Sequence, residues 1–113
     1  MIHIIIRPIT RKELQSMTAE GFGDFMKAVV DIENGIMAVG GDLHADEEAK
    51  LLDKGSKQMN LWGINLHLQK NVTDFIEFDS MINIRPSDNN RSRGVENMEI
   101  QNKIRAIVAD LIQ

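Results

Sequence analysis

The sequence predicts an α+β fold with two layers, in which a mostly antiparallel five-stranded sheet carries three helices in the order β-α-β-β-α-β-β-α. Residues 25–39 and 61–85 each have the alternating pattern and central turn of a hairpin, and hairpins pair antiparallel strands. Three further stretches have helix caps, an acidic first turn or apolar residues at helical spacing. We therefore expect the helices to pack on the apolar face of one sheet.

Length and composition exclude several classes of protein. The chain has 113 residues, the size of one domain spanning residues 1–113, and its 42% hydrophobic content argues against disorder. It has no cysteine, which excludes disulfides and thiolate metal sites. Its formal net charge of −4 argues against nucleic acid as a partner. The apolar runs are too short to cross a bilayer and the first residues resemble a strand, so we expect a soluble, cytoplasmic protein.

The first strand is predicted at residues 2–6, because apolar side chains alternate there and Pro8 stops the run. The next helix is predicted to begin at Thr10, which can form a capping box with Glu13. We expect that helix to end at a glycine at position 21 or 23.

The first hairpin, residues 25–39, is centred on the dipeptide Asn34-Gly35. This dipeptide suits a two-residue type I′ turn, since both positions need positive φ. Such a tight turn would place Ile32 opposite Met37. The near-continuous apolar character of both strands predicts a central place in the sheet.

The second and third helices are predicted over residues 45–54 and 97–112. Gly55 would provide the left-handed exit of the second helix. The third has one apolar stripe at helical spacing, typical of a helix packed on a core. That stripe consists of Ile100, Ile104, Ile107, Val108 and Leu111.

The second hairpin, residues 61–85, has one apolar and one polar face, because successive strand side chains point to opposite sides. The apolar face is predicted to consist of Trp62, Ile64, Leu66, Leu68, Ile76, Phe78, Ile82 and Ile84. The polar face is predicted to carry Asn65, His67, Glu77, Asp79, Asn83 and Arg85. Depending on the register, His67 lies opposite Glu77 or Phe75, and Asn65 lies opposite Asp79 or Glu77.

The polar face of this hairpin is the first candidate site. Glu77 and Asp79 could bind Mg²⁺ or Mn²⁺ through hard oxygen ligands, with His67 as a ligand or base. The protein would then be a divalent-metal-dependent hydrolase acting on a phosphate-bearing substrate. The competing interpretation is the ordinary solvent face of a half-exposed antiparallel sheet, with no cofactor.

Phe75 and Met81 share the parity of the polar residues. Apolar side chains on that face indicate cover by a loop or by a second subunit, so a homodimer or other homo-oligomer is one hypothesis. Scattered exposed apolar residues are equally consistent with a monomer.

The densest group of potential metal ligands lies at the start of the second helix. It lacks a second histidine at zincin spacing, and acidic residues near a helix N-terminus complement the helix dipole without any metal. We therefore interpret this group as helix-stabilising. It consists of Asp42, His44, Asp46, Glu47 and Glu48.

The loop that follows the second hairpin is the preferred site. Guanidinium groups bind phosphate or carboxylate in bidentate geometry, and asparagine amides add neutral donors. The alternative is a structural loop in which the arginines pair with Asp88, Glu96 or the acidic sheet face. The candidate anion-binding residues are Arg85, Asn89, Asn90, Arg91 and Arg93.

Four segments resemble a small uncharacterised prokaryotic protein family, a domain of unknown function of about this length. The resemblance implies a compact stand-alone domain and assigns no activity, cofactor or site residue. The segments are 27–41 (KAVVDIENGIMAVGG), 43–52 (LHADEEAKLL), 61–66 (LWGINL) and 75–94 (FIEFDSMINIRPSDNNRSRG).

Two functions follow from these observations. The preferred one is a small binding or interaction module whose Arg/Asn loop recognises an anionic small molecule beside the polar sheet face. The alternative is the metal-dependent hydrolase. The sequence has no G-x-G-x-x-G nucleotide fingerprint and no G-x-S-x-G nucleophile elbow.

Overall fold

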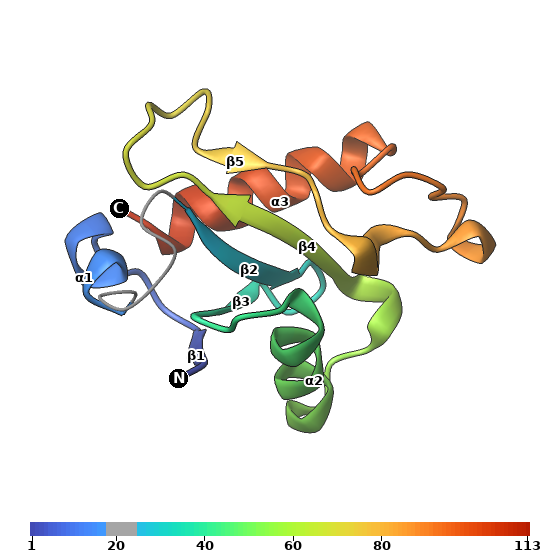
Figure 1. Cartoon of the computed structure of the whole chain (residues 1–113), viewed down its shortest axis with the longest axis horizontal. Coiled ribbons are helices and arrows are strands. Elements are labelled where there is room, and N and C mark those ends of the chain that lie inside the picture. Colours follow the sequence, from blue (N-terminus) through green and yellow to red (C-terminus); the bar gives the residue numbers. More distant parts are fainter. Residues whose placement is uncertain (18–24) are drawn as a thin grey trace.

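The computed structural model describes residues 1–17 and 25–113, which form an antiparallel sheet of five strands and three α-helices (Figure 1). The α+β class and the order of elements along the chain are confirmed. The strands are β1 (His3–Ile5), β2 (Met26–Asp31), β3 (Ile36–Val39), β4 (Leu61–Leu66) and β5 (Ile76–Glu77). The helices are α1 (Arg11–Ser16), α2 (His44–Lys54) and α3 (Met98–Leu111).

The strands lie in the order β1-β3-β2-β4-β5, so β2 is the central strand. It pairs with β3 on one side and with β4 on the other. Ala28, Val29 and Val30 are buried on both faces of the sheet, which explains why the middle of this strand is continuously apolar. The predicted central place of the first hairpin is confirmed.

The two long helices lie on opposite faces of the sheet (Figure 1). Val30 and Ile64 belong to the main core cluster with Ile104 of α3. On the other face, Val29 of β2 packs in a smaller cluster with Leu51 of α2. The helices therefore do not share one apolar face as expected. The reason is that the face of the sheet around Val29 is also apolar, and α2 shields it from water.

The predicted helix ends agree with the structure wherever it describes them. Thr10 and Glu13 form the capping box of α1. Gly55 ends α2 with φ of 110°, in the left-handed region. Asn97 caps α3 by accepting hydrogen bonds from the backbone N–H groups of Glu99 and Ile100. The expected end of α1 at a glycine lies outside the described residues.

The turn of the first hairpin differs from the prediction. Val30, and not Ile32, lies opposite Met37, and the loop has four residues, 32–35. The carboxylate of Asp31 accepts hydrogen bonds from the backbone N–H groups two and three residues further on, which favours this wider turn. Gly35 has φ of 67°, as the left-handed position of the loop requires.

The second hairpin is shorter than predicted. Asn65 lies opposite Glu77, one of the two expected registers, but β5 ends there. The chain then forms a 3₁₀ turn at Met81–Asn83, which begins where Ser80 accepts a hydrogen bond from the Ile82 N–H. The prediction of a strand that continues to residue 85 is therefore wrong, and Asn83 points inward rather than outward.

Candidate functional site

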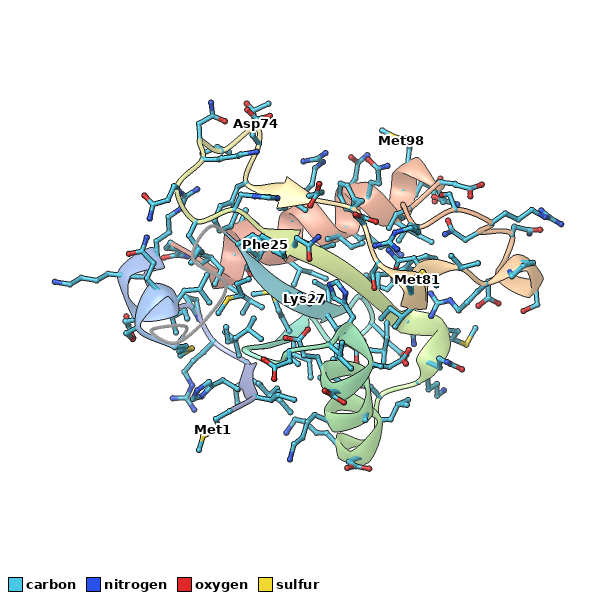
Figure 2. The ribbon with its side chains drawn as sticks, in the orientation of Figure 1. Met1, Phe25, Lys27, Asp74, Met81 and Met98 are labelled. Carbon is cyan, nitrogen blue, oxygen red and sulfur yellow. The ribbon has the colours of Figure 1, made fainter. Side chains whose placement is uncertain are left out.

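A pocket of about 390 Å³ lies where the start of α2 faces β4, β5 and the residues that follow β5. Pockets of this size bind small molecules. Phe25 and Lys27 reach it from the start of β2, and Met81 reaches it from the turn after β5 (Figure 2). We call it the α2–β5 pocket. Its polar lining residues are Lys27, His44, Asn65, Glu77, Asp79, Ser80 and Arg93.

Asn65, His67 and Glu77 form one hydrogen-bonded group on the polar face of the sheet. Asn65 Nδ2 donates to Glu77 Oε1 over 3.0 Å, and His67 Nε2 lies 3.1 Å from the same oxygen. These contacts from Asn65 and His67 hold the pKa of Glu77 below its usual value. Glu77 is therefore an ionised hydrogen-bond acceptor in the pocket wall.

The side-chain oxygen of Asn65 is a buried acceptor without a donor. Asn65 is 6% exposed, and its Oδ1 has no hydrogen-bond partner among the described residues. Exchanging the positions of the amide nitrogen and oxygen would not remove the unpaired acceptor. Nδ2 donates to Glu77 and lies 3.4 Å from the backbone oxygen of Asp79, so the exchange would place an oxygen against these two acceptors. Leaving such an acceptor unpaired costs about 1–3 kcal/mol. Asn65 lines the pocket, so this residue of the pocket wall carries an unpaired acceptor.

The start of α2 brings backbone donors to the same pocket. Leu43 occupies the N-cap and forms no side-chain cap, so the N–H groups of His44 and Ala45 have no partner within the helix. Both residues line the pocket, where the helix dipole is positive. The His44 ring donates from Nε2 to the Ile64 carbonyl over 2.8 Å, and burial lowers its pKa. The ring is therefore neutral near pH 7.

Of the three arginines in the loop that was predicted to bind an anion, Arg93 lines the pocket. Its Nε donates to Asp79 Oδ1 over 2.5 Å, so one of its predicted alternatives, a pair with the acidic sheet face, is present. Both side chains are about half exposed. The terminal nitrogens of Arg93 make no hydrogen bond to a described residue, so they can bind a further oxygen.

Arg85 and Arg91 make other contacts. The Arg85 guanidinium stacks on the Trp62 ring, 4.2 Å from its centroid, and donates to the Gln58 carbonyl over 2.8 Å. Asp88 lies 3.4 Å from its Nε. Arg91 is exposed, and its backbone N–H donates to Glu96. Neither arginine lines the α2–β5 pocket.

The two asparagines of the loop have different structural positions. Asn89 is exposed and adopts φ of 62°, which asparagine tolerates better than most residues. Asn90 is buried, and its Nδ2 donates to the carbonyls of Asn83, Ser92 and Gly94. Its amide therefore already has partners within the protein.

One member of the acidic group at the start of α2 is buried and protonated. Glu47 is fully buried and accepts the Gly41 N–H, and burial raises its pKa to about 9, so it is neutral and not a partner of the helix dipole. Gly41 is required here, because a Cβ would lie 2.9 Å from the Glu47 side chain. Residues 1–17 and 25–113 contain no group of three or more His, Asp and Glu side chains placed to hold a metal.

Of the two apolar residues assigned to the polar face, one lies elsewhere. Phe75 is buried in the main core cluster, because it lies just before β5, where the strand parity does not yet hold. Met81 is 65% exposed and lines the pocket. The sequence analysis did not identify Lys27 as a pocket residue, because its place opposite Asn65 depends on the pairing of β2 with β4.

The fold and the pocket define a small α+β protein with a polar pocket at a helix N-terminus. The chain belongs to the family described as "Protein of unknown function (DUF5674)", whose model matches residues 3–111. No curated protein and no solved structure matches the chain. Within the described part of the chain, every helix is too short or too polar to span a bilayer.

Proposed function

We propose that the protein is a binding module that holds a small polar ligand in the α2–β5 pocket. The ligand carries an anionic group, which lies near Arg93 and the start of α2, and a hydrogen-bond donor, which reaches Asn65 and Glu77. The observation that carries the proposal is the buried, unpaired Oδ1 of Asn65 in the wall of a ligand-sized pocket.

The hydrogen-bond donors that converge on the pocket favour an anionic group on the ligand. Arg93 has terminal nitrogens without described partners, and the N–H groups of His44 and Ala45 are unused within α2. A helix N-terminus with an arginine nearby attracts phosphate or carboxylate. In this proposal the anion still binds to the loop that the sequence predicted, but Arg93 is the arginine that binds it. Arg91 is exposed and does not line the pocket.

The hydrogen-bond acceptors in the same pocket favour a donor group on the ligand. Asn65 Oδ1 and Glu77 are side-chain acceptors on β4 and β5, and Glu77 is ionised. A ligand ammonium, amide or hydroxyl would satisfy the buried oxygen, and a charged donor adds about 1.5–3 kcal/mol to such a contact. A simple anion would leave this oxygen unpaired and would be repelled by Glu77.

Two small, commercially available compounds test the proposal. Phosphoethanolamine has a phosphate and an ammonium group, whereas inorganic phosphate lacks the ammonium group. In an ¹H–¹⁵N NMR titration, we expect phosphoethanolamine to bind about 10-fold more tightly or better, since one charged hydrogen bond is added. The largest shifts should fall on His44, Ala45 and Asn65.

Variants distinguish the two ends of the site. Arg93→Gln should weaken both probes, whereas Asn65→Leu should reduce only the preference for phosphoethanolamine. Lys103→Gln is the matched control, because Lys103 is exposed on α3 and lies outside the pocket. Equal binding of the two probes, or unchanged binding in Arg93→Gln, would overturn the proposal.

The metal-dependent hydrolase remains the second candidate, supported only by the contact between His67 and Glu77. Asp79 is already paired with Arg93, which weakens its use as a metal ligand. Stabilisation by Mg²⁺ or Mn²⁺ in a thermal-shift assay, abolished by Glu77→Gln with Asp79→Asn, would favour this candidate. A shift that survives both substitutions would remove it.

We further propose that the protein acts in the cytoplasm as a homo-oligomer. The absence of cysteine is compatible with a reducing compartment. Leu43 and Met81 line the pocket and are both more than half exposed, so a second subunit on this surface would bury apolar area. Light scattering after size exclusion should detect a dimer that Met81→Glu dissociates, and a monomeric wild-type protein would contradict this proposal.

A further inference from the structure

A second pocket, of about 620 Å³, lies on the α3 side of the sheet. It is bounded by the C-terminal half of α3, the first residue of α1 and the loop between β4 and β5, which lies beside the end of α3 in Figure 1. Its lining is mostly apolar and includes Phe75, Val108 and Ile112. We call it the α3 pocket.

Two arginines supply its charge. The Arg11 guanidinium lies 4.1 Å from the centroid of the Phe75 ring, and its Nη1 donates to the Lys70 carbonyl over 3.0 Å. The Arg105 guanidinium lies 5.0 Å from the centroid of the Phe78 ring. Both arginines line the pocket. Their aromatic contacts hold the charged groups over apolar surface.

Neither arginine has an acidic partner among residues 1–17 and 25–113. In the same part of the chain, Arg85 and Arg93 both form ion pairs. The described residues that line the α3 pocket include no aspartate or glutamate, and Asp74 lies at the outer tip of the nearby loop (Figure 2). Two guanidinium groups beside apolar walls are complementary to an amphiphilic anion.

We propose that the α3 pocket binds a small amphiphile whose apolar chain or ring packs on Phe75, Val108 and Ile112 and whose oxyanion head pairs with Arg11 and Arg105. Val72, 85% exposed at the pocket lining, would gain cover from such a ligand. The site is separate from the α2–β5 pocket, since the two pockets share no lining residue within the described part of the chain.

Three ten-carbon probes test the proposal. Decanoate and decyl phosphate carry the two common oxyanion heads, and decanol carries none. NMR titration should show at least one anion binding about 10-fold more tightly than decanol, because the charged head adds a bidentate contact. The shifted amides should lie in α3 and in residues 67–76. The stronger of the two anions would identify the head group.

Variants separate charge from apolar contact. The double variant Arg11→Gln, Arg105→Gln should bind the anion no better than decanol, whereas Lys103→Gln, two residues from Arg105 on α3, should behave as wild type. Thermal unfolding checks that each variant is folded. A second variant, Ala109→Trp, should fill the pocket and weaken all three probes. Equal affinity of anions and decanol, or unchanged binding in the double variant, would overturn the proposal.

Discussion

Gly63 and Asn83 form a closed pair of hydrogen bonds. The Gly63 N–H donates to Asn83 Oδ1 over 2.8 Å, and Asn83 Nδ2 donates back to the Gly63 carbonyl over 2.9 Å. The side-chain amide therefore occupies the place that a backbone peptide of a neighbouring strand would take. Beyond the end of β5, this amide completes the hydrogen bonding of β4. A Cβ at Gly63 would lie 2.5 Å from Ser80, so no larger residue fits there.

Asn83→Ala should destabilise the protein by about 2–4 kcal/mol, because buried backbone groups of Gly63 lose their partners. Asn83→Asp should be similarly harmful, since a carboxylate cannot donate to the carbonyls of Gly63 and Arg93. Urea unfolding monitored by Trp62 fluorescence measures the change. Asn102→Ala, on the exposed surface of α3, is the control and should stay near wild type. A loss below about 0.5 kcal/mol for Asn83→Ala would contradict the role of the pair.

Asn89 and Asn90 should respond in opposite ways to substitution. Asn90→Ala should cost about 2–4 kcal/mol, because its buried amide makes hydrogen bonds to three carbonyls and accepts the Glu96 N–H. Asn89→Gly should be neutral or slightly stabilising, since φ of 62° suits glycine. Urea unfolding of both variants tests the difference. Equal effects would show that the loop does not depend on Asn90.

Glu47 should make stability fall as the pH rises. Its pKa is about 9 in the folded protein against an ordinary value of 4.5, so between these values the folded state holds a proton that the unfolded state has lost. The group's contribution is fully present below pH 4.5 and is lost as the pH approaches 9. Its slope is at most about 1.4 kcal/mol per pH unit.

Glu47→Gln removes this titration and tests it. The free energy of unfolding of the wild type, minus that of the variant, should decrease between pH 5 and pH 8, roughly across the window set by the two pKa values. Urea unfolding at each pH gives the difference. Parallel curves for the two proteins would mean that Glu47 is already ionised in the folded state.

Asp31 should stabilise the fold in the opposite pH range. Burial raises its pKa, but hydrogen bonds from the Ser56 hydroxyl and from Asn34 outweigh burial and lower it below 3.8. Its contribution is therefore present above pH 3.8 and is lost as the pH falls through the folded-state pKa.

Ser56→Ala removes the 2.6 Å hydrogen bond to Asp31 and should move acid unfolding to higher pH. At neutral pH the loss should be about 1.5–3 kcal/mol, the range for a hydrogen bond to a charged group. Circular dichroism during acid titration measures the midpoint. Ser87→Ala, at an exposed position, should leave the midpoint unchanged.

Most of the fold was predictable because burial repeats with the period of the backbone. Strand parity correctly placed Asn65, His67 and Glu77 in one group, and the apolar stripe of α3 supplies the buried residues Ile104, Val108 and Leu111. Parity failed after Ser80, where a side chain and not the backbone continues the pairing. A sequence pattern assigns asparagine to the surface, so it could not identify Asn83 and Asn90 as buried.

The candidate site was predictable only in part. The polar residues of β4 and β5 followed from alternation, whereas the contribution of α2 depends on which face of the sheet that helix covers. That choice depends on small apolar patches around Val29 and Leu51, which resemble ordinary core in the sequence. The prediction of a two-residue turn at Asn34-Gly35 was wrong for a local reason. The Asp31 carboxylate accepts hydrogen bonds from the backbone N–H groups of residues 33 and 34, which favours the wider loop.

The frame of the loop after β5 is built largely from the neutral amides of Asn83 and Asn90. Their hydrogen bonds involve no charge, so added electrolyte leaves them unaltered, while it screens the field around an exposed guanidinium such as Arg93. Ionic strength would accordingly change how strongly this loop attracts a charged molecule without changing the loop's shape.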